Sequence, residues 1–219
     1  TEFYQALSMV SLPMFNIMYA DRHDTIFYIN NALMPVREES PAYNWKLTLP
    51  GNTSKTLWTK FRGIKELPQY VNPKSGFLFN TNHSSFLATA PEDNLTHSNF
   101  PKMDGWETWH NNRSLRLTEL IPKKEKLAYE DFKKIKFDRQ LPKKFAYSYA
   151  LDSLYLINTA DYPQYASLLD ELKKWDGKGD ADSKGAGIFL LAYNHLSKKL
   201  AGQASRTITM QESINTYQA

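Results

Sequence analysis

The sequence predicts an α+β fold, with strands in the N-terminal half and helices in the C-terminal half. Residues 15–29 hold two short runs rich in β-branched and aromatic residues, separated by a polar turn. Residues 30–70 are rich in Asn, Pro, Thr and Ser, so regular structure there should be short. Farther along, apolar residues recur at helical spacing. We therefore expect a strand-and-loop part over 1–106, a helical part over 107–200, and a tail or a lead into further structure over 201–219.

Composition narrows the class of protein. The 219 residues are 42% hydrophobic and 14% aromatic, enough to bury a core as one large domain or two small ones. The 27 Lys and Arg exceed the 23 Asp and Glu by only four, and many lysines occur as doublets along helical patterns. Such doublets are typical of solvated faces, whereas a nucleic-acid site would gather basic and aromatic residues on one surface. We therefore expect no nucleic-acid partner.

The sequence lacks cysteine and lacks a long apolar run. The chain has no cysteine, which excludes disulfides, thiolate metal sites and a cysteine nucleophile within these residues. No apolar run approaches the roughly 20 residues that a membrane span requires, so we expect no membrane-spanning helix. The compartment is left open by both observations.

The first elements are a short helix and a hairpin. Residues 1–10 place apolar side chains on one helical stripe, which a Leu-Pro step then ends. Because residue 1 falls inside this pattern, we expect the chain to be an internal segment of a longer one. Strands over 15–20 and 26–29 follow, joined by a polar turn in which Asp24 suits a position of positive φ.

Residues 30–70 should run over the surface of the sheet. Their aromatic side chains could anchor the excursion on the core or line a pocket for an apolar group, and anchoring is favoured. These side chains are Tyr43, Trp45, Trp58 and Phe61.

Residues 71–86 carry the most informative polar pattern. An Asn-Pro turn and a Ser-Gly step lead into the apolar run 77–79, after which Asn80 and Asn82 follow in N-x-N spacing. Amide groups at such a position suit a binding or catalytic site. Asn also caps turns by bonding its own backbone, and on local grounds the turn interpretation is favoured.

The second half should contain a series of amphipathic helices. We expect helices near 107–121, 127–137 and 145–157, then one that Asp161 begins as a cap. The acidic cluster after Trp175 lacks the Asp or Asn and the Glu that an EF-hand needs, so Asp182 or Ser183 should instead cap the last helix. That helix should turn the following side chains inward: Ile188, Leu191, Ala192, His195 and Leu196.

The residues alone show no complete active site. The five histidines include no H-E-x-x-H pair, which makes a zinc site improbable. Ser84 and Ser85 follow His83, but no G-x-S-x-G elbow surrounds them. Thr1 lies on a helix-like stripe, whereas an N-terminal nucleophile begins a strand. Local patterns therefore support only an α+β segment.

Four blocks of residues, in order along the chain, carry a family resemblance. The blocks are 15–22 (FNIMYADR) with 26–28 and 34–37; 49–51 (LPG), Trp58, 66–68 (ELP), 71–73 (VNP), 75–76 and 80–82 (NTN); 116–120 (RLTEL); and 175–177 (WDG) with 180–183 (DADS). Together they resemble the penicillin acylase family of N-terminal-nucleophile (Ntn) amidohydrolases. The second block is the most specific. The resemblance implies a segment of an Ntn-hydrolase αββα sandwich and the hydrolysis of an amide bond in an N-acyl substrate.

The resemblance also implies roles for particular residues. In this family a precursor cleaves itself, and the new N-terminal serine attacks the amide while donors stabilise the oxyanion. Asn82 matches the side-chain oxyanion donor, and Asn80 would bond the local backbone. Arg116 best matches the arginine that orients this asparagine, with Arg113 as the alternative. Asp93 matches a carboxylate ligand of the structural calcium that some members hold, although no other ligand matches, and no cofactor is required.

Several expectations follow for the whole protein. The nucleophilic serine and the other half of the oxyanion hole should precede residue 1, so the isolated segment should be inactive and should need the remainder of its precursor as partner. The substrate class, whether a penicillin, a lactone or a lipopeptide, stays open. Family members are typically periplasmic or secreted. The alternative is a noncatalytic binding or scaffold domain that retains the acylase fold.

Overall fold

The computed structural model divides the chain into two compact units, residues 1–110 and 111–219. The described residues are 2–11, 13–37, 40–121, 126–145 and 148–203. All strands among them belong to the first unit, and the described part of the second is built mainly of helices. The α+β prediction, with strands first and helices later, is confirmed. Of the tail expected after residue 200, residues 204–219 lie outside the described part.

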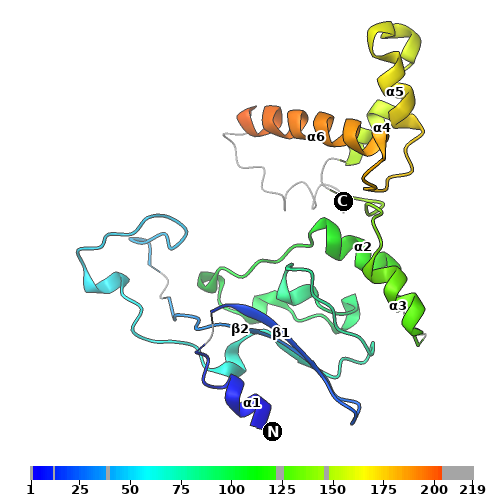
Figure 1. Cartoon of the computed structure of the whole chain (residues 1–219). Helices are drawn as coiled ribbons and strands as arrows, with labels where there is room; N and C mark the ends of the chain where they lie inside the picture. Colours follow the sequence, from blue (N-terminus) through cyan, green and yellow to red (C-terminus); the bar gives the residue numbers. More distant parts are fainter. Residues whose placement is uncertain (1, 12, 38–39, 122–125, 146–147, 204–219) are drawn as a thin grey trace. The chain divides into compact units, whose positions relative to one another are not determined.

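A three-stranded antiparallel sheet organises the first unit (Figure 1). Its order is β1 (Phe15–Ala20), β2 (Ile26–Asn31) and β3 (Gln69–Val71). Between the first two strands, Asp21 Oδ1 accepts from the backbone N–H groups of His23 at 2.8 Å and Thr25 at 3.1 Å. Asp24 has a φ of 59°, as the turn chemistry predicts. The predicted hairpin is therefore confirmed.

Strand β2 is buried on both faces, and the two faces contact different sets of residues. Phe27 and Ile29 pack with Leu67 and with Leu7 of helix α1 (Glu2–Leu7) in an apolar cluster. Tyr28 points to the other side, where it packs with buried aromatic and small side chains. Because side chains alternate along a strand, Asn30 shares the face of Tyr28. Polar groups of residues 80–85 lie over this second face.

The rest of the first unit consists of loops and single 3₁₀ turns. These turns are η1 (Ser54–Thr56), η2 (Ile64–Glu66), η3 (Ser85–Leu87), η4 (Pro91–Asp93), η5 (His97–Asn99) and η6 (Lys102–Asp104). Residues 77–79 form no strand. The prediction that the aromatic residues of this loop anchor it on the core is wrong for Trp58 and Phe61, which are 57% and 43% exposed. Tyr43 and Trp45 are half-buried.

Five helices and two 3₁₀ turns form the described part of the second unit. They are α2 (Asn112–Leu120), α3 (Tyr129–Lys136), α4 (Ser148–Tyr155), η7 (Thr159–Asp161), η8 (Pro163–Tyr165), α5 (Ala166–Lys173) and α6 (Lys184–Gln203). Helix α2 begins later than the apolar pattern predicts, because Asn111 caps it. The Asn111 side chain accepts from Ser114 N at 2.9 Å, and Ser114 Oγ accepts from Asn111 N at 2.9 Å.

Two details of the later helices correct the sequence expectations. Asp161 lies inside η7 and caps no α-helix, because the chain makes two 3₁₀ turns before α5 begins. Ser183 does cap α6, since its Oγ accepts from Ala186 N at 3.2 Å. The predicted inward face of α6 is correct at Ile188, which packs against the core, but wrong at Leu191, which is 75% exposed; Phe189, which was not predicted, is 8% exposed.

The core of the second unit explains this rotation of α6. Phe145, Leu172 and Phe189 form the buried cluster, and Trp175 stacks on Phe189 with ring centroids 4.9 Å apart. Gly185 lies in close contact with the Trp175 side chain, so no Cβ fits there. The small residue lets the indole approach the helix, and that approach decides which side of α6 is buried.

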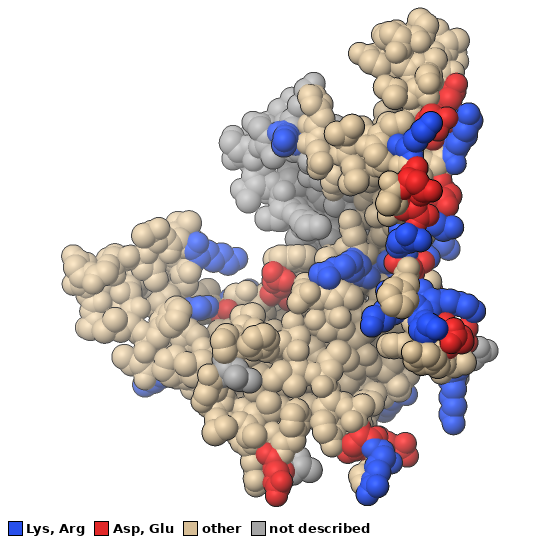
Figure 2. Space-filling model, viewed as in Figure 1, with Lys and Arg blue, Asp and Glu red and all other residues tan. Residues whose placement is uncertain are grey.

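Charged side chains are interspersed over the surface. Figure 2 shows basic and acidic groups lying beside one another, most of them along the right edge of the view, with broad uncharged areas elsewhere. On α3, Lys133 and Lys134 pair with Glu130 and Asp131, three residues earlier. The doublets there are solvated helix faces, as predicted. Among the described residues, no helix is long and apolar enough to cross a membrane.

Candidate active site

The N-x-N stretch forms a tight turn in which the two asparagine side chains differ in their contacts and exposure. Asn80 Oδ1 accepts a hydrogen bond from the backbone N–H of Asn82 at 2.9 Å. Asn82 adopts a left-handed φ of 56°, and its side chain is exposed. Asn tolerates this conformation better than most residues with a Cβ. The turn interpretation therefore describes Asn80, while Asn82 presents its amide at the surface.

A buried polar network lies under this turn. The Tyr28 hydroxyl is 2.6 Å from Asn16 Oδ1 and 2.9 Å from Ser85 Oγ, and Asn30 Nδ2 donates to the same Ser85 oxygen at 2.8 Å. Burial raises the pKa of Tyr28 to about 12, so its phenol stays protonated. Asn80 Nδ2 is buried near this hydroxyl, but the geometry of the approach falls short of a hydrogen bond. The network ties the turn to the central strand.

The next two residues fix the turn on its other side. His83 is 5% exposed, and its ring nitrogens lie 3.2 Å from Thr81 N and 2.8 Å from Leu87 O. Ser84 Oγ donates to the carbonyl of Glu107 at 2.6 Å, and Ser84 is 1% exposed. Ser84 thus serves as a structural hydroxyl.

The two candidate arginines on α2 have different surroundings. Arg116 binds Asp138 through two nitrogens, Nε at 2.8 Å and Nη2 at 3.1 Å, and binds Glu119 through Nη1 at 2.8 Å. These bonds, with Asp138 the stronger cause, raise the pKa of Arg116, and Arg116 in turn lowers the pKa of Asp138. Arg113 lies in the first turn of the helix and is exposed. Arg116 therefore works as a structural clamp within its own unit.

Asp93 is held by the backbone of a neighbouring loop. Its Oδ2 accepts from Ser75 N at 2.6 Å, a short charge-assisted bond. Within the described ranges, no group of three or more His, Asp or Glu side chains gathers around it or elsewhere. Asp93 thus has a structural role whether or not it also contacts calcium, and its metal role stays a prediction.

The loops of the first unit also form a groove of about 1220 Å³ that the sequence did not predict. Tyr43, Trp45, Trp106 and Trp109 supply its aromatic surface. The sequence marked Tyr43 and Trp45 as possible pocket residues, but nothing in it linked them to residues 106 and 109, since the loops meet only in three dimensions.

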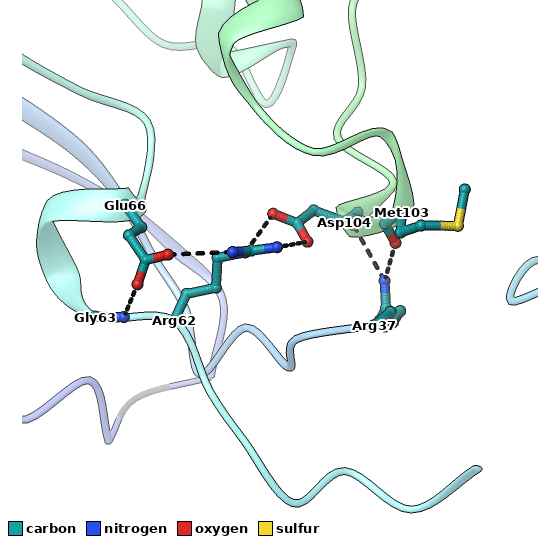
Figure 3. A network of polar contacts seen from close by, with 6 residues as sticks. All are labelled: Arg37, Arg62, Gly63, Glu66, Met103 and Asp104. Carbon is teal, nitrogen blue, oxygen red and sulfur yellow. Dashed lines mark hydrogen bonds and ion pairs between the residues drawn. The ribbon is translucent and has the colours of Figure 1, made fainter. Parts of the chain in front are cut away.

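A charged network supports this groove (Figure 3). Asp104, whose side chain is fully buried, binds Arg62 at 2.8 Å and 3.1 Å, and Arg62 also reaches Glu66 at 3.1 Å. Arg37 Nη1 donates to the carbonyls of Met103 and Asp104, each at 3.1 Å. Three loops are joined in this way, and Arg37 and Asp104 line the groove.

Comparisons with known proteins agree with this architecture. The family model for penicillin amidases matches residues 1–218. Among solved structures, a thermostable penicillin G acylase from Alcaligenes faecalis is similar, with a TM-score of 0.56 and 22% identity. The match covers 83% of this chain and 30% of that chain, so the 219 residues span under a third of the length of that acylase. At this identity the likeness concerns the fold.

Proposed function

The chain belongs to the penicillin amidase family, and from this premise we propose that it forms part of an enzyme that hydrolyses the amide bond of an N-acyl substrate. The family is one of amidohydrolases. The resemblance implies a serine nucleophile activated by its own α-amine, and in our proposal another part of the precursor supplies it. The remainder of that precursor is then the principal partner of this segment.

Asn82 is the residue on which the proposal rests. When the serine oxygen attacks the carbonyl carbon, the carbonyl oxygen becomes an oxyanion that needs donors already in place. The single observation that carries the proposal is the arrangement of the N-x-N turn. Asn80 satisfies the backbone N–H of Asn82, and the left-handed backbone leaves the Asn82 side chain exposed as an amide donor.

The experiment is Asn82→Ala in the complete protein with a chromogenic N-acyl amide. Loss of one oxyanion donor should lower kcat by about 10²–10³-fold, with a smaller change in KM. Asn99→Ala, at an exposed turn of the same unit, is the matched control and should keep the wild-type kcat. An unchanged kcat in Asn82→Ala would remove the donor role.

For the orienting arginine we propose Arg116, the best match to the family pattern, with Arg113 as the alternative. Asp138 and Glu119 bind three nitrogens of Arg116, so its guanidinium is held in one place. Arg116→Leu should therefore lower kcat by about 10-fold or more, and it should also lower stability. Arg113→Leu should leave kcat unchanged. A loss of kcat in Arg113→Leu alone would move the role to Arg113.

A noncatalytic binding domain is the second candidate, and the aromatic groove favours it. Tyr43, Trp45, Trp106 and Trp109 would contact an apolar ligand, and binding would change tryptophan fluorescence. A fatty-acyl amide that quenches the tryptophan fluorescence of the complete protein, with no release of product, would support this candidate. Turnover that depends on Asn82 would reject it.

The family also suggests where the protein works. Members are generally periplasmic or secreted, and we place the complete protein there. Fractionation of the producing cells, with a periplasmic and a cytoplasmic marker enzyme as controls, tests the placement. Recovery with the cytoplasmic marker alone would contradict it.

A further inference from the structure

The backbone of Asn82 adopts a conformation that its neighbours must maintain. A left-handed φ of 56° is sparsely populated by residues with a Cβ and costs of order 1 kcal/mol. Within the N-x-N turn, one bond that supports it runs from Asn82 N to Asn80 Oδ1. Because Asn82 itself is exposed, its own packing contributes little. The restraint has to come from the residues beside it.

His83 supplies such a restraint through both ring nitrogens. Nε2 lies 2.8 Å from Leu87 O, and since a carbonyl oxygen only accepts, Nε2 carries the hydrogen. Nδ1 is then an acceptor, and it receives the backbone N–H of Thr81 at 3.2 Å. The imidazole is therefore the neutral Nε2–H tautomer. The ring therefore holds the backbone N–H of Thr81, the residue before Asn82, while His83 itself is the residue after Asn82.

The ring is also fixed by stacking on both faces. Its centroid lies 4.9 Å from that of Phe79 and 5.7 Å from that of His110, with interplanar angles of 15° and 13°. Burial and the neighbouring His83 lower the pKa of His110 to about 4, so His110 stays neutral in the stack near pH 7. Ser84 then anchors the chain through its bonds to the carbonyls of Glu107 and Trp109.

We propose that His83 is a positioning residue for Asn82, holding the Asn80–Asn82 turn so that the Asn82 amide faces the developing oxyanion. This inference rests on the proposed function, because it assumes that Asn82 is the donor. When the His83 bonds are lost, the Asn82 backbone can relax to negative φ. Its amide then leaves the place that the transition state requires, whereas ground-state binding of the substrate changes little.

Two substitutions in the complete protein separate the hydrogen bonds from the stacking. His83→Phe keeps an aromatic ring between Phe79 and His110 but removes both hydrogen bonds. His83→Asn keeps an acceptor close to the place of Nδ1 and should partly rescue the turn. We expect kcat to fall about 10–100-fold in the Phe variant and less than about 10-fold in the Asn variant, with KM within about 2-fold. His97→Phe, at an exposed histidine of the same unit, is the control and should keep its kcat.

A double-mutant cycle distinguishes this inference from the proposed function. If His83 acts through Asn82, His83→Phe should cause no further loss of kcat in an Asn82→Ala background. Additive losses, or an unchanged kcat in the single Phe variant, would overturn the positioning role while Asn82 keeps its own. A neutral Asn82→Ala would instead reject the proposed function, and a loss in His83→Phe would then have another cause.

A third variant covers the case in which His83→Phe does not fold. His83→Gln places an amide donor near the position of Nε2 but provides no acceptor near Nδ1. The Asn variant should then retain a higher kcat than the Gln variant, because the bond to Thr81 N is the one next to Asn82. Equal losses in these two variants would overturn the proposal.

Discussion

Asn80 and Asn82 have the same side chain and differ only in what surrounds it. Asn80 closes the turn by accepting the N–H of Asn82, and its amide nitrogen is buried. Asn82 lies at the exposed apex with a left-handed backbone. A residue type alone therefore does not fix the structural position, since the same amide is buried as a turn cap at Asn80 and exposed at Asn82.

His110 gives a prediction at the scale of one residue. In the folded protein, burial and the neighbouring His83 lower its pKa to about 4. In the unfolded chain, where both effects are lost, its pKa is 6.5. Below pH 6.5 the unfolded chain binds the proton more readily, so the free energy of unfolding should fall as pH drops toward 4. The loss should be about 2 kcal/mol after allowance for partial exposure.

Urea unfolding of the complete protein at pH 7 and at pH 4.5 measures this effect. His110→Phe keeps the stacking on His83 without a titrating group, so its loss between the two pH values should be smaller than the wild-type loss. His23→Phe, at an exposed hairpin turn, is the control and should follow the wild type. Equal losses in wild type and His110→Phe would show that the burial of His110 does not govern the pH dependence.

At the scale of elements, α2 and α6 each make a contact that periodicity does not reveal. The bidentate Arg116–Asp138 pair joins α2 to the segment after α3. Trp175 lies against Gly185 and Phe189 of α6 and turns Leu191 outward. Each contact joins a helix to a residue outside it, and that is why an apolar stripe predicts the existence of a helix better than its rotation.

Two glycines on α6 provide a matched test of this packing. Gly185→Ala would place a Cβ against the Trp175 ring and should lower the free energy of unfolding by about 1–3 kcal/mol. Gly187→Ala meets nothing within 4 Å and should raise it by about 0.5–1 kcal/mol, because Ala favours the helix. Thermal unfolding of both variants measures the difference. Shifts of the same sign would contradict the close approach of Trp175 to α6.

At the scale of the whole molecule, each of the two units has its own core and its own polar network. The buried Arg62–Asp104 pair lies wholly within residues 1–110, and the Arg116–Asp138 pair within 111–219. Networks confined to one unit should stabilise that unit first. Variants that break them can therefore show how independently the units behave.

Asp104→Asn tests this independence. The substitution removes the charge that neutralises Arg62 in a buried place, so we expect a loss of about 3–5 kcal/mol from the first unit. Hydrogen exchange by mass spectrometry should show reduced protection in peptides from 1–110 and little change in 111–203. Glu66→Gln is the control, since its side chain binds the same arginine but is 53% exposed, and it should cost under about 1 kcal/mol. Equal loss of protection in both units would show that they unfold together.

The sequence by itself determined the α+β class, the hairpin, most of the helices and the family. Those features depend on local periodicity, turn residues and the order of motifs, all of which are carried by neighbouring positions in the chain. Only the tertiary structure decided which arginine is clamped, which side of α6 is buried and which loops join at Asp104. It also decided that His83 lies between Phe79 and His110. These depend on contacts between distant segments, whose partners no local pattern specifies.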